Sequence, residues 1–385
     1  MRDVPLTVER ILFSLFSLLF FLSGVYLLFL PLSYLYFATG STDKKVYNFH
    51  TLLMKISKFI IYRVPGVKFN LSNKYGEKFN KPAVIICNHQ SHLDLMCIMM
   101  LTPKLVIITN DWVWNNPFYG HIIKCARYYP VSDGVEKNLQ RLHDLIDKGY
   151  SVMIFPEGTR SEECNILRFH KGAFYLSEEF KIDIIPIFIH GAGHVLPKKD
   201  FMLRRGSISL EIAPRINYSD RSFGETDKER KSAIHKYYVS HYKEIKREKE
   251  KSEYWIEYLK YKYLHKGYRI KYNVVKRVKS GNYLEIIDNS KVTEGTVWVL
   301  KSGYGEFALL YALVHRKATV YAFEKELSKF TIASENILPD NLNFINSDNP
   351  ESSGLYPSPK IIYEVSDKYI TQKDCLLNQL KKSYI

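Results

Sequence analysis

The stretch PAVIICNHQSHLD (82–94) decides the fold of the first half of the chain. Its first part, 83–87, is a continuous apolar run with three β-branched side chains, which is typical of a strand buried on both faces. Polar residues follow at once, and among them His89 and Asp94 stand five positions apart. A chain with 12 histidines and 40 acidic residues produces such a spacing by chance, so the context must show whether the pair has a function.

Runs of the same apolar kind recur downstream, separated by stretches with helical character, and this alternation predicts an α/β domain. The predicted strands are 82–87, 104–109, 151–155, 182–189 and 207–212, and the predicted helices are 91–101, 117–126, 135–148 and 171–180. In open α/β sheets, ligands bind beyond the carboxyl ends of the strands. We therefore expect the polar residues 88–94 and PEGTRS (156–161), which each follow a strand, to face one crevice.

A histidine beside a carboxylate is suited to general-base catalysis. Because a free imidazole titrates near neutral pH, His89 could remove the proton of a hydroxyl as its oxygen attacks an acyl carbon. A bond from Asp94 to the other ring nitrogen would fix the tautomer, as the aspartate does in a Ser-His-Asp triad. The acceptor alcohol would itself be the nucleophile.

Four blocks occur in one order: NHQSHLD (88–94), FPEGTRS (155–161), FHKGAF (169–174) and IIPIFIHG (184–191). Over about residues 11–215 this order resembles the glycerolipid acyltransferases of the PlsC type. The resemblance implies that His89 is the general base and Asp94 its orienting partner. It also implies an acyl donor, acyl-CoA or acyl carrier protein, and no metal or redox cofactor. The implied acceptor-binding residues are Glu157, Gly158, Thr159 and Arg160, and the implied donor-binding residue is Pro186.

One block departs from the family pattern. The family usually carries a motif of the form FIDR, whose arginine helps to hold the phosphate of the acceptor. Here RYYPVSD (127–133) stands in its place, with Ser132 where the arginine aligns. Arg127 or Lys137 could substitute for it. The acceptor therefore stays open between 1-acylglycerol-3-phosphate and a related lyso-lipid, such as an amino-acid lipid.

The amino-terminal stretch 11–38 carries no charged residue, and it exceeds the ~20 residues needed to cross a bilayer. It predicts a retained membrane anchor, either one tilted span or a re-entrant hairpin, since Pro31 interrupts a helix. More lysines follow the stretch than precede it, which predicts a catalytic domain on the cytoplasmic side of the inner membrane. Residues 46–61 have the spacing of an interfacial helix or of a helix packed on the domain.

The net charge of +15 is concentrated in residues 221–280, which hold 18 Lys and Arg against 8 Asp and Glu. This basic stretch could bind single-stranded nucleic acid, contact anionic headgroups or form a solvated linker helix. Next to a membrane anchor, lipid is the favoured partner and no nucleic acid is expected. The five cysteines are scattered without a CxxC pair, which argues against a disulfide framework or a structural zinc site.

The segment TVWVLKSGYGEFALLYAL (296–313) resembles the first motif of class I S-adenosylmethionine methyltransferases. The resemblance implies a cofactor turn at Gly303 and Gly305, with Glu324 on the ribose. Val299 replaces the usual acidic residue of the strand, however, and Lys301 replaces the first glycine. We expect a shortened, degenerate Rossmann-like unit that does not use S-adenosylmethionine.

These patterns predict four segments: a membrane anchor with interfacial helices (1–66), an acyltransferase domain (67–218), a basic helical linker (219–280) and a methyltransferase-like domain with a tail (281–385). The predicted activity is transfer of a fatty acyl group to a lyso-lipid hydroxyl at a membrane. The alternatives are a methyltransferase and an inactive membrane scaffold.

Overall fold

The computed structural model describes residues 30–116, 120–133, 135–199, 203–264, 266–336, 338–348, 356–366 and 369–373, with isolated positions 8, 11, 12, 15, 16 and 19. The described chain forms two compact units that meet in the sequence between Ile245 and Lys246. Each unit has its own mixed sheet and its own hydrophobic core.

The first unit is built on a seven-stranded sheet of order β1-β7-β6-β2-β5-β3-β4. The five strands from β6 to β4 are parallel, whereas β7 runs antiparallel to β6 and β1 runs parallel to β7. The carboxyl ends of the five parallel strands therefore share one edge of the sheet. The strands are β1 (Val67–Ser72), β2 (Ala83–Cys87), β3 (Leu105–Thr109), β4 (Tyr129–Pro130), β5 (Ser151–Ile154), β6 (Asp183–His190) and β7 (Gly206–Ile212).

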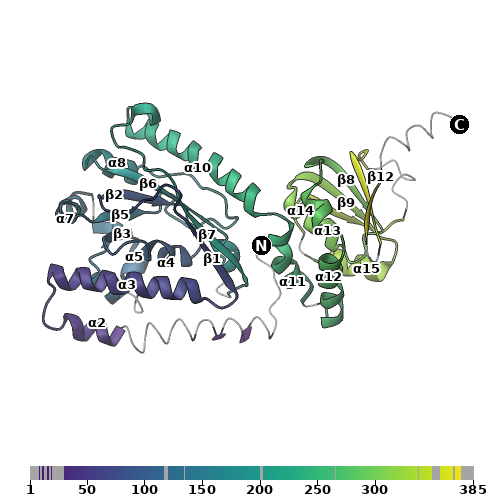
Figure 1. Ribbon diagram of the computed structural model, residues 1–385, viewed down its shortest axis with the longest axis horizontal. Coiled ribbons are helices and arrows are strands. Elements are labelled where there is room, and N and C mark those ends of the chain that lie inside the picture. Colours follow the sequence, from purple (N-terminus) through teal and green to yellow (C-terminus); the bar gives the residue numbers. More distant parts are fainter. Residues whose placement is uncertain are drawn as a thin grey trace. The chain divides into compact units, whose positions relative to one another are not determined.

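Helices cover both faces of this sheet, with α3 and α4 on one face and α8 and α10 on the other (Figure 1). The helices are α2 (Leu30–Phe37), α3 (Asp43–Arg63), α4 (Leu93–Met99), α5 (Asp111–Trp114), α6 (Gly120–Cys125), α7 (Val135–Asp147), α8 (Gly172–Glu179), α9 (Ala192–Val195) and α10 (Asp227–Lys249). Short 3-10 turns lie at Val131–Asp133 and Arg221–Phe223. The α/β prediction is confirmed, and the five predicted strands agree with the structure to within one residue at each end.

Helix α3 contains the stretch that the sequence left open between an interfacial helix and a packed helix. Val46, Phe49 and Leu53 are buried in the core of the first unit, so α3 is packed on the domain. Leu52 and Phe59 remain exposed beside them. Most of the predicted anchor 11–38 lies outside the described residues, and within the described part of the chain no helix is long and apolar enough to span a membrane.

The basic helical linker predicted over residues 219–280 is not one continuous helix. Helix α10 ends at Lys249, a 3-10 turn follows at Ser252–Trp255, and α11 (Ile256–Leu264) begins after it. Asp288 stabilises this turn, since it accepts hydrogen bonds from the backbone N–H and the hydroxyl of Ser252. As far as Ile245, α10 is part of the first unit and not a linker, since it buries Ile234, Tyr238 and Tyr242 there.

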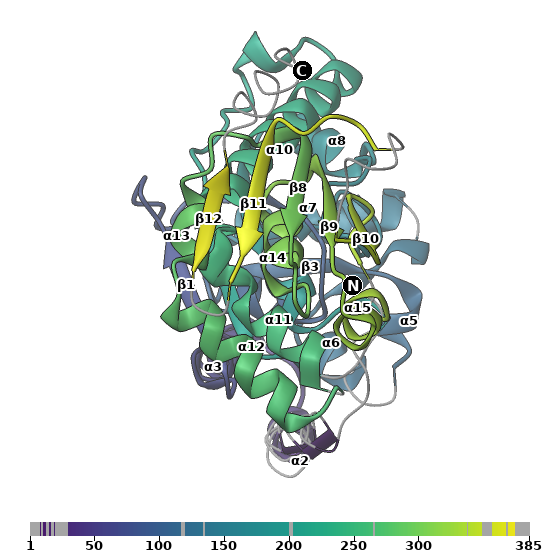
Figure 2. The same cartoon turned by 90° about the vertical axis from the view of Figure 1, so that its right-hand side faces the viewer.

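The second unit carries a five-stranded sheet of order β10-β9-β8-β11-β12, in which only β12 is antiparallel to its neighbour (Figure 2). This order corresponds to the 3-2-1-4-5 part of a doubly wound sheet. Its strands are β8 (Glu294–Leu300), β9 (Lys317–Phe323), β10 (Leu342–Ile345), β11 (Ile361–Val365) and β12 (Ile370–Lys373). Its further helices are α12 (Tyr268–Ser280), α13 (Tyr283–Asp288), α14 (Glu306–Val314) and α15 (Leu327–Ser334).

Candidate active site

The polar residues 88–94 lie at the carboxyl edge of the first sheet, directly after β2. Asn88 fixes the end of this strand, because its side-chain amide donates to the Ile189 carbonyl at 2.8 Å and accepts from the Ile189 N–H at 2.8 Å. The His89 ring stacks on Phe155, with ring centroids 3.9 Å apart. The end of β2 thus holds the imidazole in one place at the sheet edge.

His89 and Asp94 form a direct pair. The two are joined by a 2.9 Å hydrogen bond between His89 Nδ1 and Asp94 Oδ2. The His89 side chain is 20% exposed, whereas the Asp94 side chain is fully buried. Part of the imidazole therefore reaches solvent while its carboxylate partner stays hidden behind it.

Backbone N–H groups of the loop 89–94 hold the Asp94 carboxylate in place. Its Oδ2 atom also accepts the backbone N–H groups of Gln90, at 2.6 Å, and Ser91, at 2.8 Å. These donors stabilise the charged form of a buried carboxylate. The Oδ1 atom is buried and accepts no hydrogen bond from the described residues. One carboxylate oxygen thus organises the whole loop from residue 89 to residue 94.

The block FPEGTRS is tied to the same loop. Glu157 accepts the His89 backbone N–H at 3.1 Å and the Leu167 N–H at 3.0 Å, and Ser161 donates its N–H to the His89 carbonyl at 2.7 Å. Burial raises the pKa of Glu157 to about 8, so this side chain favours its neutral form at pH 7. The two polar clusters expected to face one crevice are therefore joined by hydrogen bonds.

Besides Arg160 within FPEGTRS, a second cation lies next to this block. Lys198, from the loop after α9, donates to Thr159 Oγ1 at 3.1 Å, next in sequence to Arg160. Sequence reasoning missed Lys198, because only the return of the chain after β6 brings it back to the block. His92 lies close to Arg160 and His89, and burial together with these neighbours lowers the pKa of His92 to about 4. A side chain with so low a pKa is neutral at pH 7 and is poorly suited to accept a proton there.

Comparison with known proteins places this geometry in a family. The Acyltransferase family model matches residues 68–190. A putative 1-acyl-sn-glycerol-3-phosphate acyltransferase of Caenorhabditis elegans is 30% identical over 178 residues, which cover 45% of this chain and 68% of that protein. The chain belongs to the acyltransferase family.

A second relative matches over a shorter span, and a solved structure shares the fold. A 1-acyl-sn-glycerol-3-phosphate acyltransferase of Chlamydomonas reinhardtii is 32% identical over 143 residues, 34% of this chain and 42% of that protein. The match thus spans less than half the length of that relative. The crystal structure of the 1-acyl-sn-glycerophosphate acyltransferase PlsC from Thermotoga maritima has 18% identity and a TM-score of 0.53, covering 62% of this chain and 97% of that one. The PlsC-like fold of the acyltransferase unit is therefore established.

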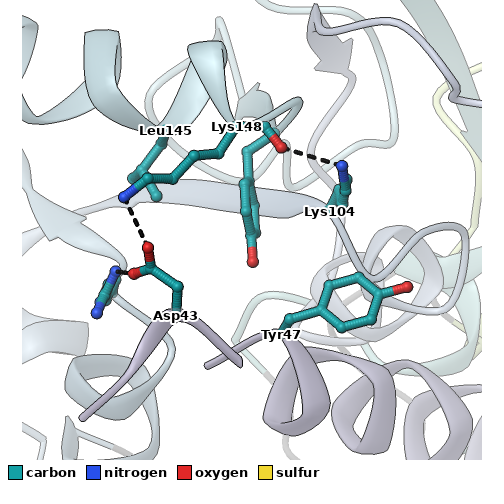
Figure 3. A pocket seen from close by; sticks show the side chains of 7 residues that line it. Asp43, Tyr47, Lys104, Leu145 and Lys148 are labelled. Carbon is teal, nitrogen blue, oxygen red and sulfur yellow. Dashed lines mark hydrogen bonds and ion pairs between the residues drawn. The ribbon is translucent and has the colours of Figure 1, made fainter. Parts of the chain in front are cut away.

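Arg127 does not lie with the candidate site of the first unit, which corrects its assignment to acceptor binding. It precedes β4 and lines a cavity of about 190 Å³ with Lys104 and Tyr150, which precede β3 and β5. This cavity therefore lies at the amino ends of the strands, opposite His89. There Asp43 pairs with Arg127 at 2.7 Å and with Lys148 at 2.9 Å (Figure 3). Ser132 follows β4 and hydrogen-bonds Asp111, whereas the Lys137 side chain lies outside the described atoms.

Pro186 is buried inside the sheet, in the middle of β6 and opposite Ile86 of β2. It offers no exposed surface to an acyl donor. The hydroxyl of Tyr238, from α10, bridges the two strands beside it by donating to the Ile86 carbonyl at 2.8 Å and accepting the Ile187 N–H at 3.1 Å. The position of Pro186 therefore favours an indirect role, through the packing of α10 on the sheet.

Gly303, Gly305 and Glu324, which resemble a methyltransferase site, lie together in the second unit. There the Glu324 carboxylate is hydrogen-bonded to the Gly303 backbone. Glu324 accepts the Gly303 N–H at 2.7 Å and the Glu326 N–H at 3.0 Å. A Cβ at Gly305 would collide with the Phe344 ring, so that ring already fills the space above the turn. Among the described residues no cluster of His, Cys, Asp or Glu could hold a metal ion.

Proposed function

We propose that the acyltransferase unit transfers a fatty acyl group from acyl-CoA or acyl carrier protein to a hydroxyl of a lyso-lipid. The observation that supports this most strongly is the His89–Asp94 hydrogen bond, with a buried carboxylate behind a partly exposed imidazole. The Nε2 atom of His89 has no hydrogen-bond partner among the described residues, so it can meet an acceptor hydroxyl.

The proposed reaction needs only these groups and the two substrates. His89 Nε2 takes the hydroxyl proton while the acceptor oxygen bonds to the thioester carbonyl carbon. The C–S bond then breaks, and the imidazolium returns its proton to the departing thiolate. Asp94 keeps the Nδ1 proton in place and stabilises the positive charge that His89 carries between the two transfers.

We propose that the acceptor carries an anionic phosphate, as 1-acylglycerol-3-phosphate does. Lys198 hydrogen-bonds Thr159, and Arg160 follows Thr159 in the sequence, so this block can supply positive charge without an arginine at position 132. The guanidinium offers a fork of donors to a phosphate and the lysine adds a point charge. An amino-acid lyso-lipid is the alternative acceptor, and it would depend less on Lys198.

We propose that the chain works at the cytoplasmic face of the inner membrane. The uncharged stretch 11–38 supports this placement, as do the exposed apolar side chains Leu35 of α2 and Phe59 of α3 in the first unit. Methyl transfer by the second unit is disfavoured, because the backbone of that unit already engages the Glu324 carboxylate. A scaffold without activity is disfavoured by the fully formed His89–Asp94 pair.

His89→Ala tests the proposal directly. Purified full-length protein in detergent or vesicles is given labelled acyl donor together with separate lyso-lipids. Loss of general-base help should lower the turnover number by roughly 10²–10⁴-fold, with unchanged membrane association. His143→Ala is the matched control, since His143 is exposed on α7 and forms an ion pair with the exposed Asp147. Transfer by His89→Ala at the wild-type rate would show that the base is wrongly assigned.

A further inference from the structure

Helix α12 of the second unit presents one continuous basic face to solvent. We define this basic face as Tyr268, Arg269, Tyr272, Lys276 and Lys279, which are all exposed. At about 100° per residue, these five positions occupy an arc of roughly 100° on the helix. Val274 and Val278 lie on the opposite side and are buried in the core of the second unit, so the orientation of α12 is fixed.

Within the described part of the chain, no acidic side chain forms an ion pair with the cations of this face. The 13 residues of α12 include five Lys and Arg but no acidic residue. Among the described residues, no ion pair involves Arg269, Lys276 or Lys279. Arg277 differs, because it faces inward and pairs with the buried Glu306 at 2.5 Å. Like charges three or four residues apart, such as Lys276 and Lys279, repel one another on a helix, and an anionic partner would relieve this repulsion.

Helix α10 provides a comparison within the same chain, because it is also rich in Lys and Arg. Its sequence mixes Lys and Arg with Asp and Glu, and Lys246 pairs with Glu250 one turn later. Helix α12 has no such mixture. The basic stretch therefore contains two kinds of helix. In α10 the cations are mixed with acidic residues, whereas the exposed cations of α12 form no ion pair with the described residues.

The tyrosines define the kind of partner. Tyr268 is 79% exposed and Tyr272 is 54% exposed, and their rings stack one turn apart with centroids separated by 6.4 Å. Tyrosine is favoured where an apolar surface meets water, because its ring is apolar and its hydroxyl is polar. Two such rings between three lysine or arginine side chains match the boundary between acyl chains and anionic headgroups.

We propose that the basic face of α12 is a contact surface for anionic membrane lipids. The surface is convex and runs along one helix, which suits a planar array of phosphate headgroups. Each basic residue close to an anionic bilayer strengthens binding by roughly fivefold, so the three cations together contribute roughly 10²-fold. The second unit would then be a lipid-binding module that uses the surface of the Rossmann-like fold in place of its cofactor turn.

The test compares two charge-matched triple variants of the full-length protein. Arg269, Lys276 and Lys279 are changed to Gln in one, and the exposed Lys291, Lys317 and Lys360 of the same unit are changed to Gln in the other. Vesicles of phosphatidylcholine alone are compared with vesicles that also contain phosphatidylglycerol. The first variant should lose roughly 10²-fold of the gain in binding caused by phosphatidylglycerol, and the second less than threefold. Equal losses in both would show that only net charge acts, and would overturn the proposal.

A local reporter distinguishes contact from long-range attraction. Tyr272→Trp should become quenched by vesicles of brominated phosphatidylglycerol, relative to the unsubstituted protein. The same change at Tyr369, which is 61% exposed on the β11–β12 hairpin, should not. Absence of quenching at position 272 would refute the proposal. The proposal would also be refuted if the protein bound a single-stranded oligonucleotide more tightly than the anionic vesicles and the first triple variant lost that binding.

Discussion

Asp94→Asn offers the sharpest test of the proposed catalytic pair. The substitution keeps the size of the side chain and removes its charge. Since Oδ2 receives N–H donors from Gln90, Ser91 and His89, the amide oxygen of the substituted side chain should take that position. The new NH2 group then occupies the site of Oδ1, where the described residues make no hydrogen bond. The imidazole should therefore keep its orientation and its tautomer.

The expected loss follows from the charge alone. With 2.9 Å between the bonded atoms, the centres of the imidazolium and carboxylate charges are about 4 Å apart. At an effective dielectric constant near 20, their attraction is about 4 kcal/mol, which corresponds to roughly 10³-fold in rate. This is less than the ~10⁴-fold loss seen when the corresponding change in a serine protease triad produces the wrong tautomer.

The assay is the initial rate of thiol release from the acyl donor at saturating acceptor, with the unfolding temperature measured in parallel. Asp144→Asn is the matched control, because Asp144 is exposed on α7. A turnover number within threefold of wild type, in a folded Asp94→Asn protein, would refute the role of Asp94. If the turnover number falls and the free energy of unfolding also falls by several kcal/mol, Asp94 has a structural role instead.

Three further predictions use the same fold. Lys198→Gln should raise the KM for a phosphate-bearing acceptor by roughly 10-fold and leave KM for an uncharged one unchanged, whereas Lys199→Gln should change neither. Burial raises the pKa of Glu157 from 4.5 to about 8, so the stability of the wild type should fall as the pH rises between these values. Glu157→Gln should lack that fall in melts from about pH 5 to about pH 9. Tyr238→Phe should cost about 2 kcal/mol in denaturant unfolding, because a buried N–H or carbonyl loses its partner.

The strands of the first unit were predictable because each central strand is a continuous apolar run. The edge strand β1 alternates between less and more exposed positions and contains Asn70, and β4 is only two residues long and includes Pro130. Neither resembles a buried strand in sequence. The break between α10 and α11 was also invisible, since no Gly or Pro marks it. The turn at the break is stabilised by Asp288, which lies 36 residues away from Ser252 in the sequence.

The candidate site was predictable where its residues lie close together in one motif. His89 and Asp94 stand in one loop, and Glu157 follows the neighbouring strand. Arg127 was wrongly assigned to acceptor binding because it is close in sequence to position 132. The two residues lie at opposite edges of the sheet, since Arg127 precedes β4 and Ser132 follows it. Lys198 contacts Thr159 although β6 and α9 lie between them in the sequence, and no local sequence pattern predicts such a contact.

The long helix after the acyltransferase blocks is a supporting part of the proposed site. Tyr238 joins β2 to β6 at the position of Pro186, a residue with no N–H to offer the neighbouring strand. Tyr242, one turn later, accepts a hydrogen bond from the Gln90 side chain, and Gln90 is the residue between His89 and Ser91. Because the Gln90 N–H also holds the Asp94 carboxylate, α10 fixes both the strand and the loop that carry the catalytic pair. A protein truncated before α10 should therefore lose the geometry of His89 and Asp94, even though it would retain all four sequence blocks.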